Sequence, residues 1–161
     1  DKMTAPAYRD IAPSDVPVLA LDGGVSVRVI AGDSHGTSGA VARPTTEPIV
    51  LDIELPPGAQ FDAELPAGHN AFVYVYAGGV EVGAESATRV DAERMAILAN
   101  DPAADGVRLR AADGIVEPAR VLLVAGKPLG EPIAQYGPFV MNTTQQLEEA
   151  FADFRRGALA G

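Results

Sequence analysis

Short apolar runs in which every second residue is apolar recur along most of this chain. Residues 25–30 read VSVRVI and residues 49–55 read IVLDIEL. A period of two places the apolar side chains on one face of a β-strand. Other short apolar runs, not all of them alternating, lie at 17–21, 61–65, 71–77, 80–82, 89–90, 95–98, 107–110 and 119–125. The pattern predicts roughly ten short strands.

Turn-forming residues separate these runs. The sequence Asp22-Gly23-Gly24 predicts a hairpin between the first two strands. The segment 71–77, AFVYVYA, is apolar on both faces and predicts a central strand covered on both sides. Residues 31–43 are rich in Gly and Ser and predict a mobile loop. Because no helix-length pattern separates the strands, a sandwich or barrel is favoured over a parallel α/β sheet.

The C-terminal segment has the period of an α-helix. One apolar stripe is formed by Leu147, Ala150, Phe151 and Phe154. A capping box fits its start in two ways, Asn142 with Gln145 or Thr143 with Gln146. Gly157 follows as a C-cap. A single helix is therefore expected to end the chain.

Composition narrows the classes of function. The chain has 161 residues, about one domain, and carries 12 Lys plus Arg against 22 Asp plus Glu, a formal net charge of −10. Such a surface disfavours nucleic-acid phosphates and anionic membranes. The chain has no Cys, which excludes disulfides and thiol catalysis. His35 and His69 are its only histidines, so a site that needs three is excluded.

Two segments carry a resemblance to a known family. Residues 65–75, LPAGHNAFVYV, and 125–143, AGKPLGEPIAQYGPFVMNT, resemble segments of the pirin family. Lys2-Met3-Thr4 with Tyr8 resembles the stretch that joins the two pirin domains. The resemblance covers essentially the whole chain but only the C-terminal half of a pirin.

The resemblance implies a fold and a division of the chain. Pirins are bicupins, so it implies a cupin-type jelly-roll β-barrel, an all-β fold with one C-terminal α-helix. The implied parts are an inter-domain lead-in at 1–15, the barrel at 16–126, and an extended Pro/Gly-rich tail with the helix at 127–161. The implied function is support of an iron-bearing N-terminal cupin domain outside this chain. The alternatives are part of a pirin-type quercetin 2,3-dioxygenase, or a protein-binding module of an iron-dependent transcriptional co-regulator.

The metal-binding cupins that the resemblance brings in share the pattern Gly-x5-His-x-His-x3–4-Glu-x6-Gly with a later His. Its two histidines at i and i+2 must point to one face of a strand, into the barrel. With the last Gly at 78 or 79, Ala71 or Phe72 takes the Glu position. The His pair then falls among residues 64–68, where only Glu64 has a metal-ligating side chain. We therefore expect no metal, cofactor or catalytic residue in this barrel. The resemblance to pirins implies iron, or another divalent metal, in the N-terminal one.

Other candidate residues have a structural interpretation beside the functional one. His69 precedes a buried strand and is expected to be a hydrogen-bonded structural histidine, although it can also line the barrel mouth. His35 is expected to be a solvated loop residue. A site built from both histidines and one carboxylate is a further alternative. Asp62 and Glu64 share a strand face and suggest a two-carboxylate hydrolase, against the simpler interpretation of a solvated face.

The helix stripe is the candidate docking surface. Leu147, Phe151 and Phe154 must be buried against something, and docking within the full-length protein is favoured over a foreign partner. The expected partner is the N-terminal pirin barrel or a second copy of this chain; a further protein partner is an alternative. The first residues, DKMT, include no initiator Met at position 1 and no signal-peptide pattern. We expect a cytoplasmic protein, and a chain that is a fragment or a processed form.

Overall fold

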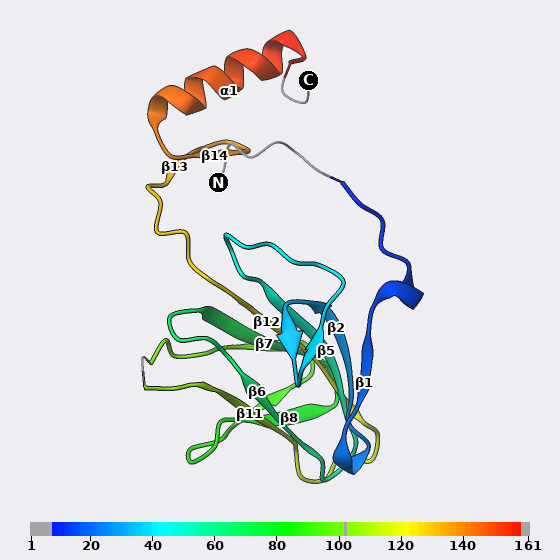
Figure 1. The fold of residues 1–161 in the computed structure, drawn as a ribbon. Helices are drawn as coiled ribbons and strands as arrows, with labels where there is room; N and C mark the ends of the chain where they lie inside the picture. The colour runs from blue at the N-terminus through cyan, green and yellow to red at the C-terminus, as the bar shows by residue number, and fades with distance from the viewer. Residues whose placement is uncertain (1–7, 102, 159–161) are drawn as a thin grey trace. The chain divides into compact units, whose positions relative to one another are not determined.

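The computed structural model of the chain describes residues 8–101 and 103–158. They form two compact units, a larger one of Ile11–Pro128 and a smaller one that combines residues 8–10 with residues 129–158 (Figure 1). Residues 1–7, which begin the predicted lead-in and carry most of its resemblance to pirins, lie outside the described residues. The larger unit contains the main β-structure, and the smaller unit contains the helix.

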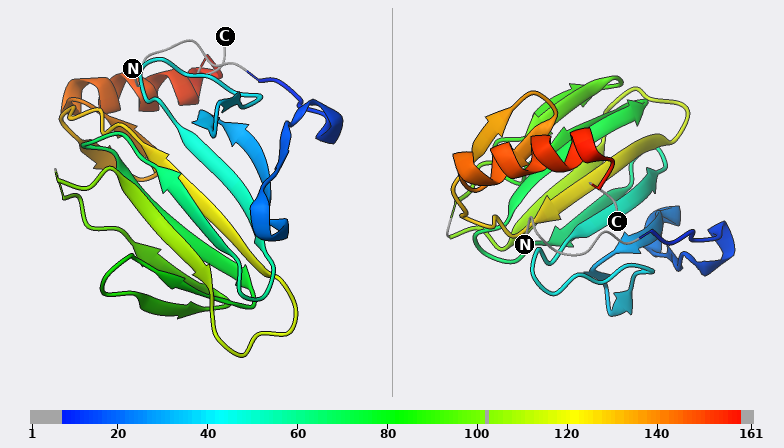
Figure 2. Two further views of the ribbon diagram at one scale, coloured as in Figure 1. Left: turned by 60° about the horizontal axis from the view of Figure 1, so that its bottom comes forward. Right: turned by 90° about the horizontal axis from the view of Figure 1, so that it is seen from above.

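The larger unit has a six-stranded antiparallel sheet whose strands run side by side (Figure 2). A short 3-10 helix, η1 (Pro13–Asp15), precedes it, and η2 (Asp22–Gly24) closes the predicted first hairpin. In spatial order, the strands are β1 (Val18–Ala20), β2 (Ser26–Ala31), β5 (Ile49–Leu55), β12 (Ala119–Gly126), β7 (Asn70–Ala77) and β10 (Arg94–Ile97).

A second sheet of four antiparallel strands packs against the first. Its spatial order is β6 (Gln60–Glu64), β11 (Gly106–Ala111), β8 (Gly79–Val82) and β9 (Thr88–Asp91). Burial alternates along β5 and β6 as their sequences predict. The predicted all-β class, with strands in two packed sheets rather than a parallel α/β arrangement, is therefore confirmed.

The core lies between the two sheets and is entirely apolar at its centre. Fully burying one Val, Leu or Ile side chain stabilises a fold by about 1.5–3 kcal/mol, so this layer dominates the stability of the unit. Its largest fully buried side chains are Leu51, Ile53, Leu55, Leu109, Leu123, Val25, Val27, Val29, Val73, Val75, Val80 and Val121.

Residues 31–43 differ from their prediction as a loop. They contain a hairpin of β3 (Asp33–Ser34) and β4 (Thr37–Ser38). His35 and Gly36 form its two-residue turn, with φ values of 48° and 77°. Two positive φ values match the twist of a tight hairpin, and histidine accepts this conformation more readily than most residues. The Gly and Ser residues that suggested mobility therefore specify a tight turn.

The outer face of β7 also differs from its prediction. Val73 and Val75 are fully buried, but Phe72 and Tyr74 on the opposite face are only half-buried. The register places Ile97, Phe72, Val124 and Val50 in one row across four strands, and Met95, Tyr74 and Leu122 in the next. We call these seven residues the apolar outer patch. Two of them, Met95 and Ile97, are 53% and 78% exposed.

The smaller unit is a hairpin with a helix. The hairpin consists of β13 (Ala134–Tyr136) and β14 (Phe139–Met141), and the helix is α1 (Thr144–Arg156). The tail predicted as extended therefore contains a short antiparallel pair. Of the two predicted capping boxes, Thr143 with Gln146 is the one formed, and Gly157 ends the helix at φ 70° as predicted. Within the described residues, no helix has both the length and the apolar character needed to cross a membrane.

Candidate functional site

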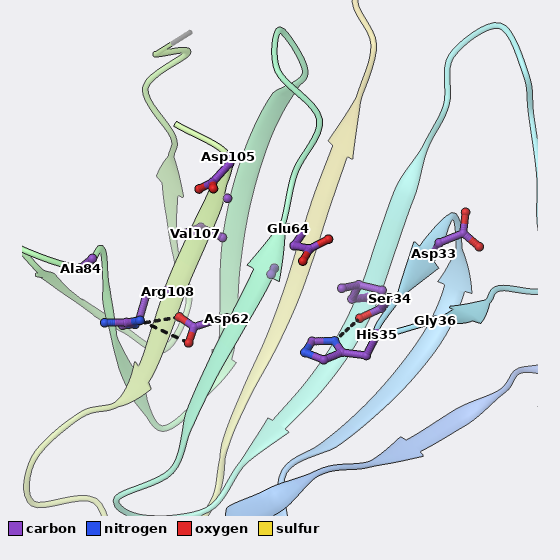
Figure 3. A pocket seen from close by; sticks show the side chains of 13 residues that line it. Asp33, Ser34, His35, Gly36, Asp62, Glu64, Ala84, Asp105, Val107 and Arg108 are labelled. Atoms are coloured by element: carbon purple, nitrogen blue, oxygen red, sulfur yellow. Dashed lines mark hydrogen bonds and ion pairs between the residues drawn. The ribbon is translucent and has the colours of Figure 1, made fainter. Parts of the chain in front are cut away.

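A cleft of about 680 Å³ opens between the β3–β4 hairpin and the β6–β11 pair (Figure 3). Core side chains, Leu51 and Ala63, form part of its floor, while charged groups surround it. Gly106 on β11 makes the β6–β11 approach possible, because a Cβ there would overlap the carbonyl oxygen of Ala63. We call this the hairpin cleft; it is lined by Asp33, Ser34, His35, Gly36, Leu51, Asp62, Ala63, Glu64, Ala84, Asp105, Gly106, Val107 and Arg108.

His35 projects from the hairpin turn into this cleft (Figure 3). It is exposed, as predicted, but its ring is held in place. Its Nδ1 lies 3.0 Å from the Oγ of the buried Ser34, and its ring centroid lies 5.2 Å from that of Phe61. These two contacts orient the imidazole, so the other ring nitrogen, Nε2, faces the cleft.

Asp62 and Arg108 form a bidentate ion pair across β6 and β11. Arg108 Nε and Nη2 donate to the two Asp62 oxygens at 2.7 and 3.3 Å. This pairing lowers the pKa of the Asp62 carboxyl, with smaller contributions from a Gln60 hydrogen bond and from His35. A general acid needs a raised pKa. The Asp62 carboxylate is therefore unsuited to donate a proton, which argues against the two-carboxylate hydrolase interpretation.

His69 lies at the start of β7, where the turn at residues 66–69 leads into the strand. Its backbone N–H donates to Pro66 O at 3.2 Å, and its side chain is 3% exposed. His69 is therefore a buried residue at a strand start. The predicted side-chain hydrogen bond is not formed, because neither Nδ1 nor Nε2 has a hydrogen-bond partner.

Glu47 is the charged group that faces His69, and sequence patterns did not identify it. Its Oε2 lies 3.5 Å from His69 Nε2, and its Oε1 accepts a hydrogen bond from Lys127 Nζ at 3.0 Å. Glu47 has a φ of 42°, so the backbone turns sharply there. The local turn residues around position 47 were the available signal, but 22 residues separate Glu47 from His69 and no short motif links them.

A second cavity of about 920 Å³ lies beside the hairpin cleft, and we call it the loop cavity. The two share Asp33, Glu64 and Asp105 in their linings. His35 and His69 line different cavities, which places them in separate sites. The loop cavity is lined by Gly32, Asp33, Ala42, Arg43, Pro44, Glu47, Pro48, Ile49, Glu64, Leu65, Pro66, Ala67, His69, Ala103, Ala104 and Asp105.

The barrel interior does not offer a donor set for a metal ion. Of the two positions that the cupin pattern offers for its Glu ligand, Ala71 faces the core and is buried, whereas Phe72 faces outward. The neighbouring interior positions on β7 are Val73 and Val75. Among residues 8–101 and 103–158, no three His, Asp or Glu side chains converge in an arrangement that would hold a metal. These residues do not fit the iron site of a cupin.

The predicted docking stripe on the helix is partly covered within its own unit. Leu147 is buried, and Phe151 packs edge-to-face on Phe139 and Tyr136, with ring centroids 4.8 and 5.6 Å apart. Phe154 is 64% exposed and touches only the margin of this cluster, at 6.1 Å from Phe139. The β13–β14 hairpin is therefore one surface against which the stripe packs.

Comparison with known proteins assigns the fold to a family. The pirin C-terminal cupin domain matches residues 50–160 of this chain. A Pseudomonas aeruginosa protein provisionally named quercetin 2,3-dioxygenase is 45% identical over 99% of this chain and 55% of its own length. Human pirin is 34% identical over 96% of this chain and 51% of its own.

A solved structure agrees with these sequence matches. The crystal structure of a quercetin 2,3-dioxygenase from Acinetobacter baumannii superposes with a TM-score of 0.81 and 33% identity, over 96% of this chain and 51% of that one. The chain thus spans about half the length of the relatives it matches. By sequence and by fold, this chain belongs to the pirin family and corresponds to its C-terminal cupin domain.

Proposed function

We propose that this chain is the metal-free C-terminal half of a two-barrel protein and that it supports an iron-bearing N-terminal cupin barrel. The observation that carries the proposal is the apolar outer patch. Phe72, Tyr74, Leu122 and Val124 are half-buried on a sheet whose other face is already the core. Met95 and Ile97 extend the patch to the sheet edge. Contiguous exposed apolar surface of this kind is typical of an interaction site.

The greater length of the relatives supports a second barrel as the surface that docks on this patch. The relatives are about twice as long as the region they share with this chain. The charged positions of the sheet flank the patch and do not interrupt it. Arg28 pairs with Asp52 and Arg120 pairs with Glu54, so those charges are neutralised beside the apolar rows. A broad apolar face with paired charges at its margin favours docking of a protein surface over binding of a small molecule.

The apolar interior supports the metal-free part of the proposal. Iron in a cupin requires several histidines and a carboxylate that point inward, and this interior presents Val, Leu, Ile and Ala. The chemistry of the whole protein would then belong to the other barrel. The names of two relatives make quercetin 2,3-dioxygenation the first candidate for that activity. This chain would affect it by stabilising and positioning the other barrel.

Elemental analysis of the purified chain tests the metal-free proposal. After expression in iron-supplemented medium, the chain is expected to hold well under one iron per molecule. His69→Ala should leave that value unchanged, because in the described part of the chain His69 and Glu47 belong to no group of three metal-ligating side chains. About one iron per chain that His69→Ala abolishes would overturn the proposal.

A chimera tests the supporting role. This chain would replace the C-terminal half of the Pseudomonas aeruginosa relative, and the purified chimera is expected to retain the iron content of its parent. Ile97→Lys in the chimera should lower its melting temperature and its iron content, because a buried charge would face the second barrel. Val18→Lys, at the opposite edge of the same sheet, is the matched control. Equal behaviour of both variants contradicts docking at the patch.

A further inference from the structure

We propose that the loop cavity binds an organic cation, an ammonium group carried on an apolar body. The cavity, about 920 Å³, has the size of a ligand site for a small organic molecule. Its walls combine apolar side chains with a few charged ones, which is the usual composition of such sites. The apolar part is formed by Ala42, Pro44, Pro48, Ile49, Leu65, Pro66, Ala67, Ala103 and Ala104.

The charged side chains around the cavity favour a positively charged ligand. Four carboxylates line it, from Asp33, Glu47, Glu64 and Asp105, against one guanidinium from Arg43. Lys127 neutralises part of the Glu47 charge from behind. Local excess of negative charge raises the concentration of cations and repels anions. An anionic ligand is therefore disfavoured, and a cation is favoured over a neutral molecule of the same shape.

Three carboxylates, those of Asp33, Glu64 and Asp105, lie at the rim of the loop cavity. Asp33 accepts a hydrogen bond from Ser38 Oγ at 2.6 Å. Glu64 and Asp105 lie at the adjoining ends of β6 and β11, with Asp33 across the gap on the hairpin (Figure 3). Their side chains project at the shared rim of the two cavities and are exposed. They provide the first acceptors that an incoming ammonium group would meet.

His69 is the independent indication that something binds here. It lines the cavity, its side chain is 3% exposed, and both ring nitrogens lack a hydrogen-bond partner. A buried polar group without a partner is costly, and such groups in native proteins call for an explanation such as a ligand or an ion. Its Nε2 faces Glu47 Oε2 at 3.5 Å, and the Glu47 side chain is exposed on the cavity side. An ammonium group bound to Glu47 would lie beside the carboxylate that faces the imidazole, so the His69 ring would report its binding.

Titration of the full chain with three matched probes tests the proposal. The probes are 2-phenylethylamine, its neutral analogue 2-phenylethanol, and the anion 3-phenylpropanoate. NMR of the histidine ring and of the methyl groups of Ile49 and Leu65 locates binding. We expect saturable shifts at these three residues with the amine, and at least about tenfold weaker binding of the alcohol. Equal binding of all three probes, or shifts confined to other residues, would overturn the proposal.

Charge-neutralising variants show whether amine binding depends on the carboxylates of the cavity or on the net charge of the protein. Glu64→Gln with Asp105→Asn should weaken amine binding by about fivefold for each carboxylate removed, as for an ion pair of about 1 kcal/mol. The control, Asp113→Asn with Glu117→Gln, removes the same total charge from exposed positions outside both cavities and should leave affinity within about twofold. If both pairs weaken binding equally, the amine is attracted only by the net charge and the proposed site is wrong.

A fourth probe distinguishes the source of the cation. A capped tetrapeptide with one lysine carries the same ammonium group on a protein-like body. If it shifts His69 with higher affinity than 2-phenylethylamine, the cavity recognises a lysine side chain of a partner protein. If only the free amine binds, the ligand is a small molecule. Failure of both probes contradicts the inference, and it leaves the metal-free and supporting roles unaffected because those concern the barrel interior and the opposite sheet face.

Discussion

The phenol of Tyr76 donates a 2.6 Å hydrogen bond to Asp52 Oδ1, although strand β12 lies between the strands that carry them. The Tyr76 side chain therefore spans the outer face of β12. Asp52 also pairs with Arg28 Nη1 at 3.3 Å on β2. Three side chains thus link β7, β5 and β2 on the outer face of the sheet, across the intervening β12. This link borders the apolar outer patch and limits its extent.

The Tyr76–Asp52 link predicts a loss of stability at alkaline pH. Partial burial, with the Asp52 hydrogen bond and its charge, raises the pKa of Tyr76 from 10.0 to about 12. Because the folded state holds the phenol proton more tightly, this stabilisation is complete below pH 10 and disappears as the pH rises towards 12. Tyr76 is 37% exposed, so solvent screening reduces its worth to about 1 kcal/mol.

Urea unfolding of wild type and Tyr76→Phe as a function of pH measures this contribution. The variant should be about 1 kcal/mol less stable at pH 8, and the difference should shrink between pH 10 and 12. Absorbance of tyrosinate should show one wild-type tyrosine titrating near pH 12 that the variant lacks. A difference in stability that does not change with pH would contradict a proton-linked bond.

The helix depends on the aromatic cluster around Phe151. Replacing Phe151 by Ala removes two edge-to-face contacts and half-buried apolar area, a cost of about 2 kcal/mol. Hydrogen exchange of the amides of α1 should accelerate accordingly, with little change in the β-sheets of the larger unit. Phe154→Ala is the control because Phe154 is mostly exposed. Equal acceleration in both variants would contradict a dominant contribution of Phe151 to the stability of α1.

Removal of the helix gives a stronger form of the same prediction. Truncation after Asn142 leaves Tyr136 and Phe139 without the ring of Phe151. We expect the truncated chain to aggregate, because this apolar surface becomes exposed. Light scattering and thermal unfolding check the result. A truncated chain that stays monomeric with an unchanged melting temperature would contradict it.

The strands could be predicted because their chemistry is local. A period of two in β5 fixes which side chains face the core, and the Asp-Gly pair between two apolar runs is a strong signal for the hairpin of β1 and β2. The same holds for α1, where Thr143 and Gln146 are three residues apart. Composition misled the prediction at His35 and Gly36, because Gly and Ser occur in loops and in tight turns alike.

The candidate sites were far less predictable. His69 could be placed at a strand start, but Glu47 and Lys127 meet there only because the ends of distant strands converge. The Asp62–Arg108 pair depends on the register of β6 and β11, which joins positions 46 residues apart. The exposure of one face of β7 depends on what the neighbouring sheet leaves uncovered, and no pattern within residues 71–77 distinguishes that case from burial on both faces.

The exposed patch predicts that the isolated chain self-associates. Met95 and Ile97 at the sheet edge, with the half-buried Phe72, Tyr74, Leu122 and Val124, present a continuous apolar surface. The net charge of −10 opposes association at long range, but salt screens it beyond about 8 Å at physiological ionic strength. Apolar contact then dominates at short range, and a two-fold dimer covers the same patch on both copies.

Light scattering over a concentration series decides whether the dimer forms. We expect the mass to rise from the 16.6 kDa of the monomer towards twice that value at tens of micromolar, an estimate for a modest interface. Met95→Lys with Ile97→Lys should keep the chain monomeric, because two like charges would meet across the two-fold axis in an apolar contact. Val18→Lys adds a charge at the far edge of the same sheet and should leave the dimer intact.

A wild-type mass that stays at 16.6 kDa across the series would rule out the dimer. Disruption by Val18→Lys alone would place the contact on β1 instead of the patch.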